Sequence, residues 1–377
     1  MCRLTVLLIL FMLTRPSSLP SPTTELQDPA ATIVGSGASP AAVYLHFDAD
    51  SILHRSYVGL ADIARSRAVD AGTTFNFFSV TKTLTATAIL QLAEQGLLAL
   101  DTPVVRYLGE FPYGDRITLR HLLTHTGGLP NPLPLSWVHF PEEHGKFDEH
   151  AFFEKVFTKH PKTRSVPGAS MRYSNLDYVW LGWVIERVSG KPYEAYVQEH
   201  LLSKSGVGAQ AGFRIDPAVH AKGYQPYWSF MNLLLGMFID KAKLMGPREG
   251  KWKPFRHNQL NGSAYGGLIG TPAALARIGQ MMLGDQLLSP ESKRLFFEAY
   301  TLNDGRPAGI ALSWFTGALH GHAYRHHAGG GGGYYAEFRL YPSLGRGSVL
   351  VMNSTGMTDR KLLDRIDADR IASLKAN

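Results

Sequence analysis

Residues 79–100 read SVTKTLTATAILQLAEQGLLAL, and the residues that open this apolar-periodic run, Ser79-Val80-Thr81-Lys82, decide how the chain is interpreted. A serine and a lysine three residues apart on a helix lie on one face, one turn apart. A lysine can take the serine's proton where desolvation holds its amine neutral. Taken alone, this common spacing is more typical of a helix N-cap followed by a surface lysine. Two later motifs favour the catalytic interpretation.

The first of these motifs is Tyr173-Ser174-Asn175, which follows a turn marked by Pro167-Gly168 and precedes a helical pattern over about 176–188. On the approach to a helix, side chains can point into a cleft. The phenol of Tyr173 can exchange a proton, and the amide of Asn175 can bind a substrate carbonyl.

The second motif is His327-Ala328-Gly329-Gly330, which lies just before a predicted strand at 334–341. Glycines here allow a ligand to approach the backbone closely. A backbone N–H of this segment could pair with the N–H of Ser79 as an oxyanion hole.

The order Ser-x-x-Lys, Tyr-x-Asn and then a basic residue followed by x-Gly resembles the serine β-lactamase and penicillin-binding-protein superfamily. The resemblance is to its class C branch, which includes esterases and D-amino-acid peptidases. Residues 75–108, 117–130 and 265–292 are also similar to the family, and the likeness extends over about 40–375. It implies an α+β, β-lactamase-like fold, with an antiparallel sheet flanked by helices and a mostly helical second lobe.

The resemblance also implies roles for individual residues. Ser79 would attack an ester, amide or peptide carbonyl to form an acyl-enzyme, while Lys82 and Tyr173 share its proton and return it to the leaving group. Which of the two is the formal base stays open. Asn175 would position the substrate and Lys82.

The remaining implied roles belong to the late glycine-rich segment. The N–H of Ser79 and that of Gly330, or of Gly329 one residue earlier, would hold the oxyanion. His327 would bind a substrate carboxylate or tune the pKa of Tyr173. No metal and no organic cofactor are implied.

Two positions depart from the pattern of true β-lactamases. His327 stands where they usually carry lysine, and Asn131-Pro132 stand where class C enzymes usually carry a glutamine. Both changes favour a β-lactamase-related esterase or peptidase acting on a small-molecule or peptide substrate. The alternatives are a true class C-type β-lactamase or D-alanyl-D-alanine carboxypeptidase, and a non-catalytic structural or binding relative.

Composition narrows the function classes. The 377 residues are 45% hydrophobic and 18% charged, which is typical of an ordered globular protein. The net charge of +7 comes without a basic run or basic-aromatic interleaving, so nucleic-acid binding is not expected. His121 and His125 are spaced for a metal on one helix face, but the glutamate of H-E-x-x-H and a third ligand are missing.

The N-terminus predicts export. Arg3 followed by the apolar residues 4–13 is typical of a signal peptide over 1–18, and the protein is then periplasmic or secreted. No clean cleavage site is visible, so an uncleaved segment that anchors the chain to a membrane is the alternative. Residues 19–38 are interpreted as a linker and 39–377 as the hydrolase domain.

Periodicity predicts where the sheet lies. Strand pairs are expected at 43–48 with 52–62 and at 334–341 with 347–353, and a C-terminal helix at 361–374. The two ends of the chain would therefore share one sheet-bearing lobe. The middle, about 76–264, is expected to be mostly helical, with long loops.

Overall fold

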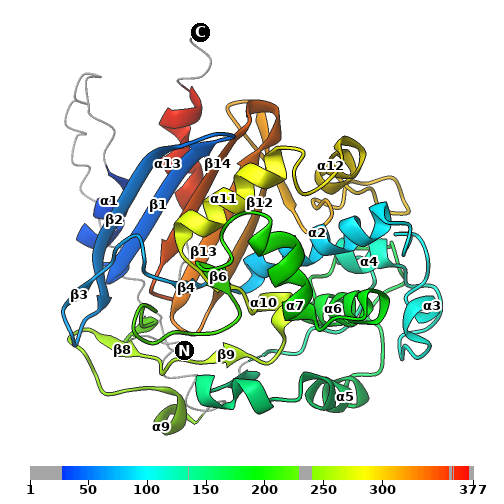
Figure 1. Ribbon diagram of the computed structural model, residues 1–377, viewed down its shortest axis with the longest axis horizontal. Coiled ribbons are helices and arrows are strands. Elements are labelled where there is room, and N and C mark those ends of the chain that lie inside the picture. Colours follow the sequence, from blue (N-terminus) through cyan, green and yellow to red (C-terminus); the bar gives the residue numbers. More distant parts are fainter. Residues whose placement is uncertain (1–27, 135, 229–239, 356–358, 360, 373–377) are drawn as a thin grey trace, which may run out of the picture.

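Seven antiparallel strands form the central sheet of the computed structural model, which describes residues 28–134, 136–228, 240–355, 359 and 361–372 (Figure 1). The predicted signal peptide and residues 19–27 of the predicted linker lie outside these residues. The strand order is β11-β12-β13-β14-β1-β2-β3. The bounds are β1 Ala41–Asp48, β2 Ile52–Asp62, β3 Arg67–Ala68, β11 Phe315–Leu319, β12 His322–Gly331, β13 Tyr334–Tyr341 and β14 Arg346–Met352.

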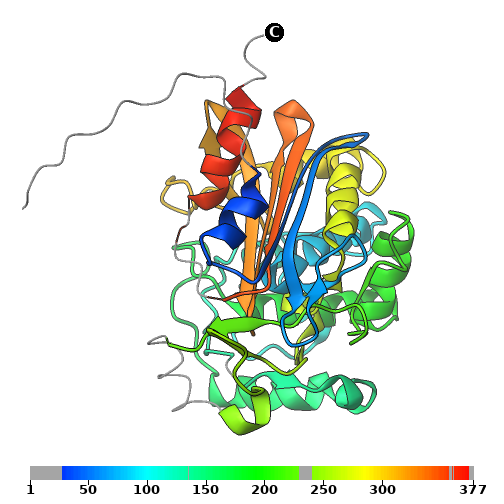
Figure 2. The ribbon, with the colours of Figure 1, turned by 90° about the vertical axis from the view of Figure 1, so that its left-hand side faces the viewer.

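Both predicted strand pairs and the predicted C-terminal helix are confirmed. β1 and β14, from opposite ends of the chain, are neighbours in register from Ala42 opposite Met352 to Asp48 opposite Arg346. Both strands are buried along almost their whole length, which fits their apolar sequences AAVYLHFD and RGSVLVM. Helices cover both faces of the sheet: α1 and α13 lie on one face, and α11 on the other (Figure 2).

The second lobe is helical, as expected. Its elements and the remaining helices are η1 Phe78–Val80, α2 Thr81–Glu94, α3 Val105–Leu108, α4 Leu119–Leu123, η2 Pro141–Lys146, α5 Glu149–Lys159, α6 Asn175–Ser189, α7 Tyr193–Val197, η3 Gln198–Ser203, α9 Lys241–Leu244, α10 Ser263–Gly266, α11 Pro272–Leu283, α12 Pro290–Phe297, η4 Pro342–Leu344 and α13 Leu362–Ala372. Among the described residues, no helix has both the length and the apolar character to cross a membrane.

Three smaller sheets are formed by short strands that lie in the loop regions of the chain. They are β4 Phe75–Asn76, β10 Ile269–Gly270 and β6 Ala211–Gly212 in one sheet, β5 Val138–His139 with β9 Gln259–Leu260, and β7 Tyr224–Pro226 with β8 Trp252–Pro254. The first of these sheets matters for the site, because β4 ends two residues before η1.

Helix α2 runs through the centre of the protein and is buried on all sides from Thr81 to Leu92. Its four threonines are tolerated there because their hydroxyls find acceptors. Thr83 Oγ1 donates to Val80 O at 2.8 Å, and Thr87 Oγ1 donates to Thr83 O at 2.8 Å. The helix that begins next to Ser79 is therefore held rigidly.

The structure corrects the expected linker. Residues Pro29–Gly35 form helix α1, whose N-cap Asp28 accepts hydrogen bonds from the N–H groups of Ala30 and Ala31. Proline at the first helical position is compatible with this cap because it has no N–H to satisfy. Ala30 and Ile33 are buried against the sheet, so the segment belongs to the domain.

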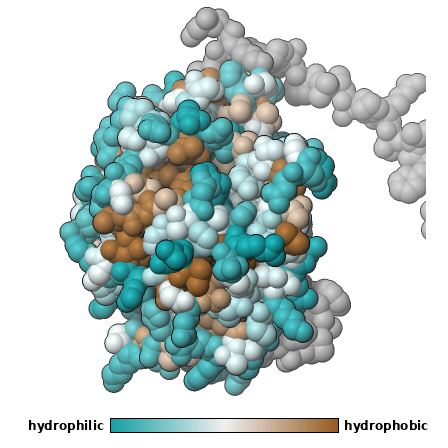
Figure 3. All heavy atoms as spheres, turned by 90° about the vertical axis from the view of Figure 1, so that its right-hand side faces the viewer, coloured by the Kyte–Doolittle hydropathy of each residue, from teal (hydrophilic) through white to brown (hydrophobic). Residues whose placement is uncertain are grey.

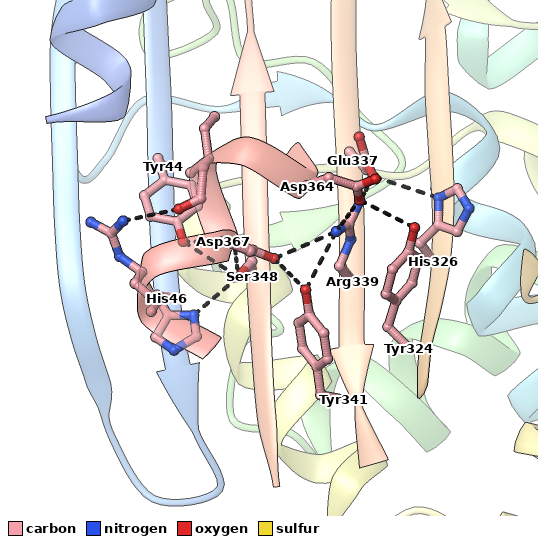
Figure 4. Close-up of polar contacts among 12 residues, drawn as sticks. Tyr44, His46, Tyr324, His326, Glu337, Arg339, Tyr341, Ser348, Asp364 and Asp367 are labelled. Carbon is pink, nitrogen blue, oxygen red and sulfur yellow. Dashed lines mark hydrogen bonds and ion pairs between the residues drawn. The ribbon is translucent and has the colours of Figure 1, made fainter. Parts of the chain in front are cut away.

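A buried polar network holds α13 on the sheet (Figure 4). Arg339 on β13 donates to Glu337 at 2.9 Å and to Asp364 on α13 at 2.7 Å. Asp367, one turn further along α13, accepts from Tyr44, Ser348 and Tyr341 at 2.8–2.9 Å. Arg339 and Asp367 are at most 1% exposed, so these polar contacts are shielded from water.

Candidate active site

Ser79 lies in the 3-10 turn η1, immediately before α2. The preceding residue, Phe78, has φ of +45°, an uncommon conformation for a non-glycine residue and one often found at functional sites. Two side chains contact Ser79 Oγ: Lys82 Nζ lies 3.1 Å away, and Tyr173 Oη donates to it at 2.8 Å. The structure thus brings together the predicted Ser-x-x-Lys and Tyr-x-Asn motifs around one hydroxyl.

Lys82 is completely buried, and its ammonium position is surrounded by oxygen atoms. Besides Ser79, its Nζ lies 2.9 Å from Asn175 Oδ1 and 2.7 Å from the carbonyl oxygen of Tyr265 on α10. Burial lowers the pKa of Lys82 well below its usual value, and the only opposing influence comes from Asp177. Burial therefore favours the neutral form of the amine.

Tyr173 and Asn175 flank Ser174, the N-cap of α6. Burial raises the pKa of the Tyr173 phenol, so the hydroxyl keeps its proton at neutral pH. The backbone N–H of Asn175 donates to Asn131 Oδ1 at 3.0 Å, and Ser174 Oγ donates to Pro130 O at 2.7 Å. These bonds fix the Tyr-Ser-Asn motif against the loop that follows α4.

The glycine-rich end of β12 runs beside Ser79. β11 pairs with β12 only as far as His326, so the edge of β12 beyond that residue has no strand partner among the described residues. At Gly329, a Cβ atom would lie 2.2 Å from Phe77 O and 2.8 Å from Ser79 N, closer than any side chain allows. Gly330 has no such contact. Which N–H of the two completes the oxyanion hole stays a prediction.

His327, which was expected to bind a substrate carboxylate or to tune the pKa of Tyr173, is buried beside the site. Its side chain is 1% exposed, and Nδ1 donates to Ala328 O at 2.9 Å. Burial and the neighbouring Lys82 lower the pKa of His327 to about 3, so the imidazole is neutral at physiological pH. A neutral imidazole does not attract a substrate carboxylate through charge. The His327 ring lies beside Tyr173, with ring centroids 6.2 Å apart.

Sequence reasoning missed two contributors. The carbonyl of Tyr265 holds Lys82, but a main-chain acceptor has no residue-type signature in a sequence. Asn131 was noted only for replacing another residue, yet it anchors Asn175. Among the described residues, no group of three or more His, Cys, Asp or Glu side chains is arranged to hold a metal ion.

A surface groove of about 980 Å³ lies elsewhere, on the helical lobe. Its walls come mainly from α3, α5 and α6 and include Leu108, Phe111, Phe157, Trp180, Trp183 and Glu186. Figure 3 shows the side of the protein on which α3 lies, where hydrophobic residues form separate patches among hydrophilic ones. None of the site residues lines this groove, so it is distinct from the site around Ser79.

An antiparallel sheet beside a helical lobe, with a Ser-Lys-Tyr cluster between them, defines a protein of the serine β-lactamase and penicillin-binding type. Comparison with known families agrees. The chain belongs to the Beta-lactamase family, whose profile matches residues 27–372.

Relatives within this family have several activities in their names. D-alanyl-D-alanine-carboxypeptidase/endopeptidase AmpH of Escherichia coli (strain K12) is 23% identical over 365 residues, which are 91% of this chain and 86% of that protein. Esterase EstB of Burkholderia gladioli is 35% identical over 170 residues, 41% of this chain and 43% of that protein. A penicillin-binding protein of Bacillus subtilis (strain 168) is 24% identical over 266 residues, which cover 70% of this chain but only 57% of that protein.

Solved structures share the fold. The octameric penicillin-binding protein homologue from Pyrococcus abyssi superimposes with a TM-score of 0.72 at 23% identity, over 91% of this chain and 77% of that one. The D-amino acid amidase from Ochrobactrum anthropi SV3 superimposes with a TM-score of 0.71 at 17% identity, over 92% and 98% of the two chains. The predicted family and fold class are confirmed.

Proposed function

We propose that the protein is a serine hydrolase that forms an acyl-enzyme at Ser79 with ester, amide or peptide carbonyls. The observation that carries the proposal is the position of Ser79 Oγ, 3.1 Å from Lys82 Nζ and 2.8 Å from Tyr173 Oη. A hydroxyl held between a neutral amine and a phenol has both a proton acceptor and a proton donor within reach. The names of the relatives, an esterase, a carboxypeptidase and an amidase, support the same chemistry.

The steps follow from the hydrogen bonds. Neutral Lys82 donates to Asn175 Oδ1 and Tyr265 O, which leaves its lone pair for the proton of Ser79. Oγ attacks the carbonyl carbon, and the N–H of Ser79 together with an N–H of the β12 glycines stabilises the oxyanion. Tyr173 protonates the leaving group and regains a proton from Lys82. Water then attacks the acyl-enzyme by the reverse route.

We infer that the substrate does not need a carboxylate next to the scissile bond. Support comes from His327, which is buried and neutral where a true β-lactamase usually has a charged lysine. Asn131, whose side-chain oxygen is engaged by Asn175, and Pro132 stand where class C enzymes usually place a glutamine. Short neutral esters therefore fit the site better than penicillins or peptides with a free C-terminus.

A substrate comparison tests this function. The wild-type protein should hydrolyse p-nitrophenyl acetate or butyrate faster than nitrocefin. A matched pair of neutral and acidic esters should show parallel pH profiles of kcat/KM, because His327 does not titrate near neutral pH. Faster turnover of nitrocefin, or a loss of activity confined to acidic esters as pH rises, would restore the lactamase or carboxypeptidase alternative. The non-catalytic alternative predicts no Ser79-dependent turnover of any of them.

A further inference from the structure

His125 binds the residues that precede and follow Tyr173 in the chain. It follows α4 with φ of +54°, a conformation rarely adopted by a non-glycine residue. Its backbone carbonyl accepts from the N–H of Arg172 at 2.7 Å, and its imidazole Nδ1 accepts from the N–H of Ser174 at 3.2 Å. The two residues that flank Tyr173 are thus both bound to one histidine.

The imidazole of His125 also contacts the phenol ring. The ring centroids of His125 and Tyr173 are 4.3 Å apart, and Tyr178 lies on the imidazole at 5.2 Å. Tyr178 is itself fixed, because its hydroxyl donates to Leu123 O at 3.0 Å. The position of Tyr173 over Ser79 therefore depends on how the imidazole is oriented.

Asp177, in the first turn of α6, orients that imidazole. Its Oδ2 lies 2.7 Å from His125 Nδ1, and both side chains are 0% exposed. Neither His125 Nε2 nor Asp177 Oδ1 has a hydrogen-bond partner among the described residues. An ionised pair would bury an unsatisfied imidazolium N–H and an unsatisfied carboxylate oxygen, which costs more than leaving neutral atoms unpaired. The N–H of Ser174 points at Nδ1, so Nδ1 carries no proton and the proton between the two side chains belongs to the carboxyl group of Asp177. The one lone pair of Nδ1 is then shared between the Asp177 O–H and the more distant Ser174 N–H.

We propose that His125 and Asp177 form a neutral hydrogen-bonded pair that positions Tyr173 for the reaction at Ser79 and spares Lys82 a carboxylate counter-charge. Both are positioning residues, and the proposal rests on the function proposed above. A carboxylate at Asp177 would stabilise the ammonium form of Lys82, which cannot accept a proton from Ser79. The protonated carboxyl leaves Lys82 neutral and still fixes the imidazole.

The groups around the pair agree with this protonation state. Lys82 on α2 and neutral His327 on β12 face His125, and burial together with Lys82 lowers the pKa of His125. Burial raises the pKa of Asp177, with Lys82 as the opposing influence. The other titratable neighbours of Asp177 are the phenols of Tyr113, Tyr173 and Tyr178, which carry no charge at neutral pH.

Two substitutions at Asp177 test the proposal by steady-state kinetics on p-nitrophenyl butyrate. Asp177→Ala should lower kcat at least about tenfold with little change in KM, because Tyr173 and Lys82 lose their alignment while substrate binding remains. Asp177→Asn should restore most of kcat and leave the acid limb of the pH profile in place, since its amide N–H can donate to Nδ1 as the carboxyl O–H does. A full kcat in Asp177→Ala would overturn the positioning role. An Asn variant as slow as Ala, with its acid limb moved to lower pH, would show that Asp177 is ionised.

A spectroscopic measurement needs neither activity nor a stable alanine variant. The infrared difference spectrum of wild type against Asp177→Asn should contain the C=O band of a protonated carboxyl group, and carboxylate bands in its place would overturn the neutral pair. Because this arm is independent of turnover, a protein that hydrolyses no ester would contradict the proposed function alone. The matched control for the kinetic experiment is Asp367→Asn. Asp367 is another aspartate with 0% exposure, but it is located on α13, so its substitution should leave kcat and KM unchanged.

Discussion

Ser79, Lys82 and Tyr173 have complementary protonation states, and this complementarity arises from burial. Desolvation penalises the charged form of each group, so it lowers the pKa of the Lys82 amine and raises that of the Tyr173 phenol. Burial therefore favours the neutral form of both groups. A neutral amine can accept a proton and a neutral phenol can donate one, which is the arrangement that acyl transfer requires.

The pH dependence of activity and stability should reveal the neutral Lys82. The folded pKa lies below the unfolded value, so between the two the unfolded chain binds more protons and stability rises with pH. kcat/KM should also rise with pH as Lys82 loses its proton. Lys82→Met should lower kcat by about 10²–10⁴-fold, the usual contribution of a general base, and should flatten the stability slope in urea unfolding. The exposed Lys204→Met is the control, and a rate that falls with rising pH in this range contradicts the assignment.

Gly329 should be the least replaceable residue of β12. A Cβ there would lie 2.2 Å from the carbonyl oxygen of Phe77 and 2.8 Å from the amide nitrogen of Ser79. Gly329→Ala must therefore push the strand away from the nucleophile, and we expect a loss of at least about 10²-fold in kcat, as when one oxyanion donor is removed. Ester kinetics check this against Gly145→Ala, where an added Cβ meets nothing within 4 Å. Equal activities of the two variants would place the oxyanion hole elsewhere.

At the scale of elements, the sheet is completed by the two ends of the chain and then covered by α13 through charged groups. Arg339 lies between Glu337, Asp364 and Asp367, and Asp367 in turn binds Tyr44 and other hydroxyls of the sheet. Removing one member of such a buried network leaves its partners uncompensated.

Arg339→Met should accordingly destabilise the protein by about 3–5 kcal/mol, the usual effect of breaking a buried ion pair. Arg294→Met removes the exposed pair with Glu298, whose side chains are 64% and 56% exposed, and should cost less than about 1 kcal/mol. Urea unfolding measures both, and ester hydrolysis by the folded fraction should be unchanged. Similar losses for the two variants would mean that the network contributes no more than a surface pair.

Local patterns predicted the elements whose signal lies within a few residues. β2 and β13 have the expected bounds, and α6 begins at Asn175, one residue before the expected start. Helix α1 was missed because Pro29 and the alanines after it are equally frequent in linkers, and only packing on the sheet distinguishes the two. The strand order was beyond prediction because it depends on contacts between distant segments.

The site residues also fall into two groups, those that local patterns predict and those that depend on contacts between distant segments. Ser79, Lys82, Tyr173 and Asn175 were predicted because their spacing is local and their chemistry is specific. The neutrality of His327 was not, since burial is set by Phe315 and other neighbours that the sequence does not place. Likewise, the sequence drew attention to His125 only for its spacing from His121, and its partner Asp177 is 52 residues away.

At the scale of the whole molecule, the reacting groups come from both lobes, with Ser79 and Tyr173 from the helical lobe and Gly329 from the sheet. We expect the protein to be exported, because Arg3 and the apolar residues 4–13 resemble a signal peptide. N-terminal sequencing of protein from its native host should find a chain that begins after about residue 17. An intact Met1 in a membrane fraction would favour an anchor, and an intact Met1 in the cytosol would contradict export.

Covalent labelling of Ser79 tests the central claim most directly. Intact-mass measurement after treatment with a fluorophosphonate should show one adduct on the wild-type protein and on Ser165→Ala, a control in which a half-buried serine without a hydrogen-bond partner for its hydroxyl is removed. Ser79→Ala should remain folded, by far-UV circular dichroism, and carry no adduct. An adduct that persists on Ser79→Ala, or that never forms on the wild-type protein, would contradict an acyl-enzyme at this residue.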